Sequence, residues 1–110
     1  MPFRNLPVNE PAALASLIEA RPGQVSSMSL TAFADPVSAT LLAFSAGESV
    51  SEERYPGDML YLAVEGSLDI VFADRRMRLH AGEVLRVPAQ VEHAVEPAGA
   101  AKLLQIGLPA

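Results

Sequence analysis

The chain has 110 residues, of which 50% are hydrophobic and 19% are charged, and its formal net charge is -5 at pH 7. This length fits a single domain, and the composition is that of a globular protein rather than a disordered one. Because 13 acidic residues outnumber 8 basic ones and cysteine is absent, the sequence argues against nucleic-acid binding and excludes disulfides, thiolate nucleophiles and cysteine-ligated zinc.

The sequence contains no apolar segment of the kind that targets or anchors a chain. Its first residues, MPFRNLPVNEP, alternate in polarity and lack the continuous apolar stretch of a secretory signal. The longest apolar run, MLYLAV at residues 59–64, is far shorter than the roughly 18 residues of a membrane helix. We therefore expect a cytoplasmic protein that has no membrane partner.

Residues 9–23 predict one short helix. Asn9 is a suitable N-cap, and Pro11 falls in the first turn, where a missing N–H costs little. Apolar side chains then recur three and four positions apart and form a single stripe: Leu14, Leu17 and Ile18. Such a helix would pack on the face of a sheet.

Short β segments separated by turn residues follow this helix. Their rhythm is typical of an antiparallel sandwich or barrel and predicts an all-β fold. The candidate strands are residues 25–30, 40–45, 59–64, 68–72, 77–79, 84–87, 93–95 and 102–106. We expect an N-terminal extension with helix and strand over residues 1–36 and a barrel over residues 37–110, within one domain.

Two stretches of the β region are framed by glycine and proline. Residues 47–66, GESVSEERYPGDMLYLAVEG, contain a Pro-Gly-Asp turn and end in a Glu-Gly hairpin. Residues 82–97, GEVLRVPAQVEHAVEP, follow after 15 residues. In this order and at this separation the two stretches resemble the two motifs of the cupins. The resemblance implies a double-stranded β-helix, which is a jelly-roll barrel.

The resemblance also identifies the positions of a metal site. In metal-binding cupins the ligands are two histidines separated by one residue, a glutamate beyond the turn, and a histidine of the second motif. The corresponding residues of this chain are Glu53, Tyr55, Met59 and His93, so one ligand in four is kept. A thioether is a soft ligand, and tyrosine is normally protonated at pH 7. The site is therefore a degenerate metal motif, and we expect no metal or other cofactor.

Three functions are open for such a barrel. The favoured one is binding of a small organic molecule in a pocket lined by Glu53, Tyr55, Met59, Leu62, Leu85 and His93. The second is metal-free acid/base isomerisation or epimerisation, with His93, Tyr55 and Glu53 as catalytic candidates, by analogy with cupin-related sugar epimerases. The third is metal-dependent oxygenase or isomerase chemistry with unusual ligands. The sequence does not decide whether the protein is an enzyme.

The apolar residues of the N-terminal strands predict a homodimer. Short barrels commonly cover an open edge or an apolar face in a symmetric pair. The residues expected at this interface are Val25, Met28, Leu30 and Phe33. The cupin resemblance likewise implies homodimers.

Overall fold

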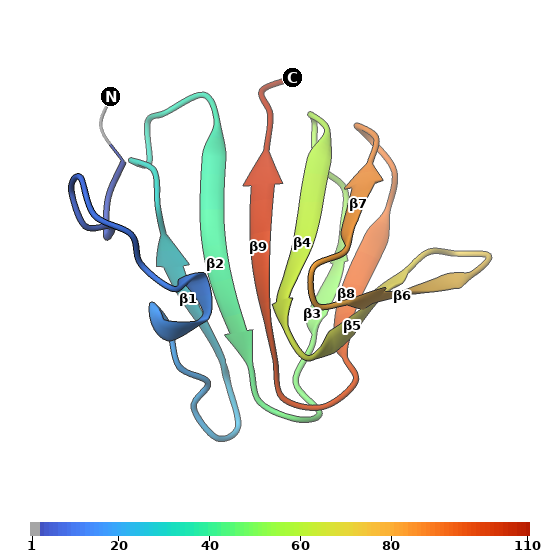
Figure 1. The fold of residues 1–110 in the computed structure, drawn as a ribbon. Helices are drawn as coiled ribbons and strands as arrows, with labels where there is room; N and C mark the ends of the chain where they lie inside the picture. Colours follow the sequence, from blue (N-terminus) through green and yellow to red (C-terminus); the bar gives the residue numbers. More distant parts are fainter. Residues whose placement is uncertain (1–2) are drawn as a thin grey trace.

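Residues 3–110 are described by a computed structural model in which nine strands form two facing sheets (Figure 1). The strands are β1 Val25–Ser29, β2 Ser38–Phe44, β3 Val50–Glu53, β4 Met59–Glu65, β5 Ser67–Val71, β6 Arg76–His80, β7 Val84–Val87, β8 His93–Pro97 and β9 Ala101–Gly107. One sheet has the order β1-β2-β9-β4-β7 and the other the order β3-β8-β5-β6, and the neighbouring strands are antiparallel. This is the all-β jelly roll that the sequence predicts.

All eight predicted strands are present, and β3 is a ninth that the sequence did not reveal. Its residues read VSEE, and only Val50 is partly buried. The strand forms because β8 offers it a partner: Val50 pairs with Val95, and Glu53 pairs with His93. Pairing with a neighbour has therefore overridden a local sequence with little strand propensity.

The N-terminal helix is much shorter than predicted. Only Leu14–Ser16 is helical, as a single 3-10 turn (η1), and no side chain caps it. Asn9, the expected cap, instead has a positive φ of 60°. An isolated helix of about 12 residues is marginal in water, so packing decides the conformation of this segment. Within residues 3–110, no helix has the length and apolar character needed to cross a membrane.

The segment around η1 lies on the outer face of the five-stranded sheet (Figure 1). Its residue Ile18 is buried against Leu41 and Ala43 of β2. Lys102 of β9 helps to hold the segment on the sheet, because its ammonium donates a 2.6 Å hydrogen bond to the carbonyl of Ala15. The apolar stripe recognised in the sequence therefore has its predicted role, even though its backbone is not an α-helix.

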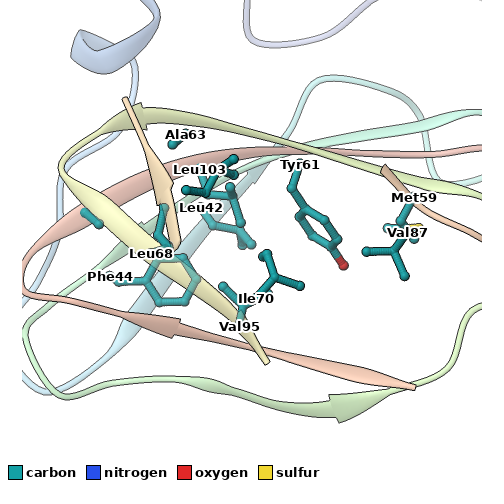
Figure 2. Packing of buried hydrophobic residues seen from close by; sticks show 12 residues of the cluster. Leu42, Phe44, Met59, Tyr61, Ala63, Leu68, Ile70, Val87, Val95 and Leu103 are labelled. Atoms are coloured by element: carbon teal, nitrogen blue, oxygen red, sulfur yellow. The ribbon is translucent and has the colours of Figure 1, made fainter. Parts of the chain in front are cut away.

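The main core fills the space between the two sheets (Figure 2). Side chains of β4 point alternately into this core and away from it, as strand geometry requires. The buried members of the cluster are Leu42, Phe44, Met59, Tyr61, Ala63, Leu68, Ile70, Leu79, Val87, Val95, Ala101 and Leu103. Tyr61 is the only one of these residues with a polar hydroxyl, and the site lies beside it.

The loop between β3 and β4 is held at the same end of the barrel. Gly57 approaches the backbone of Leu108 so closely that an added Cβ would overlap the Leu108 carbonyl oxygen. Two residues earlier, the carbonyl of Tyr55 accepts a 2.8 Å hydrogen bond from the backbone N–H of Gln90. These two contacts fix the backbone on either side of the turn, and they place the Tyr55 ring beside the barrel interior.

Candidate functional site

A histidine and a tyrosine from opposite sheets meet inside the barrel. His93, which is 2% exposed, begins β8, and Tyr61, which is 1% exposed, lies in β4. Figure 2 shows the Tyr61 hydroxyl directed away from Phe44. This hydroxyl is 2.6 Å from His93 Nε2.

The second nitrogen of His93 fixes the tautomer of the ring. His93 Nδ1 is 2.9 Å from the carbonyl oxygen of Val91. A carbonyl can only accept, so Nδ1 carries a proton and donates it to Val91. Nε2 then accepts the hydrogen bond that the Tyr61 hydroxyl donates. A charged imidazolium would carry a proton on Nε2 and would leave this hydroxyl without an acceptor. Both nitrogens of His93 are therefore used inside the protein.

Aromatic rings surround His93. The centroid of the Tyr61 ring is 5.4 Å away in an edge-to-face arrangement, that of Tyr55 is 5.8 Å away, and that of Phe72 is 6.3 Å away. These separations are within the range of favourable aromatic pairs. The rings hold the imidazole from several sides and leave it little freedom to turn.

A narrow crevice leads from this pair to the surface. Its lining residues are Val50, Ser51, Glu53, Tyr55, Tyr61, His93, Ala94, Val95 and Gln105. The empty space between them, its opening included, is about 170 Å³, and it is too narrow to hold a water molecule. Small-molecule sites are usually roughly 300–1,000 Å³. A ligand at this crevice must therefore be compact, and it must displace a lining side chain.

Glu53 gives the crevice a negative electrostatic field. Burial raises the pKa of the Tyr61 hydroxyl far above its ordinary value, and the neighbouring Tyr55 and the Glu53 carboxylate raise it further. Burial and Glu53 also raise the pKa of Tyr55, an effect that the Gln105 side chain partly offsets. Both phenols are protonated at neutral pH as a result, and each can serve as a hydrogen-bond donor.

Three of the six residues predicted for the pocket line this crevice: Glu53, Tyr55 and His93. Met59 belongs to the main core and Leu85 packs against it, and neither lines the crevice. Leu62 is on the opposite face of β4, as the alternation of the strand requires. Met59, Leu62 and Leu85 are therefore not among the residues that line this crevice.

Tyr61 and Gln105 are site residues that sequence reasoning missed. The resemblance to metal-binding cupins directed attention to the positions of their ligands, and neither residue occupies one. A signal for Tyr61 was nonetheless present, because it follows Met59 by two positions in a strand and must share its face. Gln105 pairs with Tyr61 across the β4 and β9 ladder, and this register is set by tertiary structure alone.

The side chains at this site do not fit the ligand set of the metal centre that the fold family implies. The lone pair of His93 Nε2 accepts from Tyr61, and the raised pKa of Tyr61 makes its phenolate costly to form. Met59 does not line the crevice. In the part of the chain that the structure describes, residues 3–110, no group of three or more His, Cys, Asp or Glu side chains is placed to hold a metal ion.

Comparison with solved structures shows strong likeness over the whole chain. A cupin superfamily protein from Desulfitobacterium hafniense DCB-2 has 48% sequence identity, a TM-score of 0.94 and full coverage of both chains. A conserved protein of unknown function from Streptococcus pyogenes is 18% identical, with a TM-score of 0.93 and coverage of 100% of this chain and 96% of that one. The second likeness shows the fold alone.

More distant likeness extends to a putative ethanolamine utilization protein from Salmonella typhimurium LT2, which is 18% identical, with a TM-score of 0.69 and coverage of 81% of this chain and 72% of that one. No curated protein matches the chain. The family model described as "Cupin domain" matches residues 40–107, which is more than half of the sequence. The chain therefore belongs to the cupin family.

Proposed function

We propose that this cupin binds a compact organic molecule at the crevice beside His93, without a resident metal. The observation that carries the proposal is the 2.6 Å hydrogen bond between Tyr61 and His93 Nε2, since it occupies the nitrogen that would otherwise bind an ion. The other polar groups of the crevice, on Ser51, Glu53 and Gln105, are at or near its opening and are available to a ligand.

Acid/base catalysis by His93, Tyr55 and Glu53 has less support. A general base needs a free lone pair near the substrate, and the one on His93 Nε2 accepts from Tyr61. The raised pKa values of Tyr55 and Tyr61 also move these phenols away from neutral pH, where proton exchange is most efficient. Binding requires neither group to change its protonation state.

The Tyr55 ring is the side chain most suited to make room for the ligand. It is partly exposed, whereas Tyr61 and His93 are buried and bonded to each other. Its backbone is held by the hydrogen bond from Gln90, so the ring can rotate without movement of the loop. Entry would then require a rotamer change, which exposed side chains make rapidly.

The test is a titration of the protein with a library of small organic fragments, in which changes in the amide chemical shifts report binding. We expect shifts that centre on Ser51, Tyr55 and Ala94. In the variant Ser51→Phe, an aromatic ring would fill the crevice and abolish these shifts. The matched control Glu52→Phe places the same ring on a neighbouring residue that does not line the crevice. Absence of any perturbation at the crevice, at millimolar fragment, would contradict the proposal.

We also propose that the protein is a homodimer in which two β1 strands pair. Leu30 donates to Ala39 in a 2.8 Å hydrogen bond, and hydrogen-bonded pairs alternate along an antiparallel ladder. The backbone groups of Val25 and Ser27 therefore point away from β2, and among residues 3–110 they have no backbone partner. Strand β1 is an edge that neither lysine nor proline protects.

The surface beside this edge suits a second copy of the chain. A groove of about 570 Å³ runs between β1 and the segment after η1, and Glu19 and Arg21 are both on its lining. In a two-fold arrangement centred on Ser26, the backbone N–H and C=O of Val25 in each copy would form hydrogen bonds with those of Ser27 in the other copy. Opposite charges on the rim make the surface complementary to itself, as a two-fold interface must be.

A further inference from the structure

We propose that the ligand of the crevice is a small organic cation that donates hydrogen bonds through an ammonium group. The inference rests on the proposed binding function and specifies its ligand class. Glu53 is the only formally charged side chain among the lining residues. The positively charged group nearest to it in sequence, Arg54, is directed to Glu92 across an exposed ion pair of 3.9 Å. The crevice therefore attracts positive charge and repels anions.

The remaining polar groups of the crevice complement a donor. The Tyr61 oxygen keeps a free lone pair while its hydroxyl donates a hydrogen bond to His93 Nε2, and the Ser51 hydroxyl and the Gln105 amide oxygen can each accept. The two nitrogens of His93 are occupied, so no imidazole N–H faces the ligand. Together with the Glu53 carboxylate, these oxygens offer enough acceptors for the three N–H groups of an ammonium ion.

The aromatic rings favour the same class of ligand. The Tyr55 and Tyr61 rings line the crevice, and their faces carry the negative part of the ring quadrupole. A cation within about 6 Å of such a ring is attracted to that face. Glu53 also raises the pKa of both phenols, which places the field of its carboxylate inside the crevice and not only in solvent. The Glu53 side chain is therefore the expected partner of the ammonium.

The small size of the crevice sets the size of the ligand. Its empty space of about 170 Å³ includes the opening and holds no water-sized volume, so a ligand enters only if a side chain such as the Tyr55 ring moves. A short alkylammonium needs only a small displacement of a lining side chain to enter, whereas a sugar or a nucleotide would require the barrel itself to open. With Glu53 at the rim and Tyr61 at the closed end, the ammonium group would lie between them and the alkyl group would contact Val50 and Val95.

The experiment compares three probes of similar size: ethylammonium, acetamide and acetate. Each is titrated into the full chain at constant ionic strength, and binding is followed by amide shifts of Ser51, Tyr55 and Ala94. We expect ethylammonium alone to shift these residues. Glu53→Gln should weaken its binding about tenfold or more, because hydrogen bonds to a charged group are stronger than neutral ones. Glu52→Gln removes an equal charge from a neighbouring residue outside the crevice and should leave the affinity within about twofold.

The outcomes separate this inference from the binding function on which it rests. Binding of acetate or acetamide in place of ethylammonium would overturn the assignment of a cation while leaving a small-molecule site. Equal ethylammonium affinity in the wild type and in Glu53→Gln would overturn the role of Glu53. Shifts caused by Zn²⁺ or Mn²⁺ but not by ethylammonium would replace the organic cation with a metal ion. No response at the crevice to these probes or to the fragment library would defeat both proposals.

Discussion

Single hydrogen bonds decide the chemistry of this barrel at the scale of the residue. The Tyr61 hydroxyl fixes His93 as a neutral ring that carries its proton on Nδ1, and the Val91 carbonyl fixes it from the other side. A histidine at the position of a metal ligand has thereby become part of the core. The chemical character of the site follows from this pair, and two variants test what such bonds contribute.

Tyr61→Phe is expected to destabilise the protein by roughly 1–3 kcal/mol, because it leaves buried His93 Nε2 without a donor. Chemical denaturation measures this loss, and long-range proton–nitrogen NMR of the wild type should report the tautomer protonated on Nδ1. Tyr55→Phe is the matched control, since the Tyr55 ring is partly exposed, and we expect its loss to be well below that of Tyr61→Phe. Equal losses, or a ring protonated only on Nε2, would contradict the assignment.

Asp69 of β5 is expected to make an acid-sensitive contribution to the free energy of unfolding. Its side chain is 6% exposed and receives a paired contact from Arg78, at 2.8 and 3.2 Å, and one from Arg76 at 3.1 Å. The hydrogen bonds from Arg78, followed by those from Arg76, lower the pKa of Asp69. The folded pKa is therefore below the unfolded value of about 3.9, so this stabilisation is complete above about pH 4 and disappears as the pH falls through the folded pKa.

Replacement of Asp69 tests this prediction. Asp69→Asn should cost about 2 kcal/mol at pH 7, the usual worth of hydrogen bonds to a charged group, and should flatten the stability profile below pH 4. Thermal unfolding between pH 2 and pH 7 measures both effects. Asp74→Asn removes a carboxylate that pairs only with exposed Arg75 and should change little. A profile that remains as steep in Asp69→Asn as in the wild type would exclude Asp69 as its source.

At the scale of the element, the η1 segment depends on one lysine. Lys102 is 14% exposed, donates to the Ala15 carbonyl and lies 3.5 Å from Glu65. The partly buried ammonium joins residues that are 87 positions apart in the sequence. Lys102 of β9 therefore adds to the packing of the segment's own apolar side chains in holding η1 on the sheet.

Lys102→Met keeps the apolar stem and removes the ammonium. We expect local opening of residues 14–18 to become easier by about 1 kcal/mol, the net worth of one hydrogen bond, while the strands keep their protection. Amide hydrogen exchange resolves the two regions. Glu65→Gln removes only the exposed partner and should leave the exchange of η1 unchanged. Uniform loss of protection across the barrel would contradict a local role for Lys102.

At the scale of the whole molecule, the free edge of β1 predicts the assembly. The N–H of Ser27 points away from β2, so proline at this position removes no hydrogen bond from the sheet but blocks a strand that approaches from outside. We expect a dimer for the wild type and for Ser27→Ala, and a monomer for Ser27→Pro. Light scattering at micromolar concentration measures the mass, and circular dichroism checks that the variant is folded. A monomeric wild type, or a dimeric Ser27→Pro, would contradict the proposed interface.

The sequence by itself determined the fold, because alternating polarity, turn residues and two glycine-framed motifs are local signals that each strand carries for itself. It also directed attention to Glu53, Tyr55 and His93, which line one crevice. Only the tertiary structure showed β3, whose polar residues form a strand through pairing with β8. It also showed that the predicted helix is a single turn, which accepts a hydrogen bond from Lys102. It likewise selected Tyr61 as the partner of His93. These features depend on which residues meet across the barrel, and a linear pattern carries no record of contacts between distant strands.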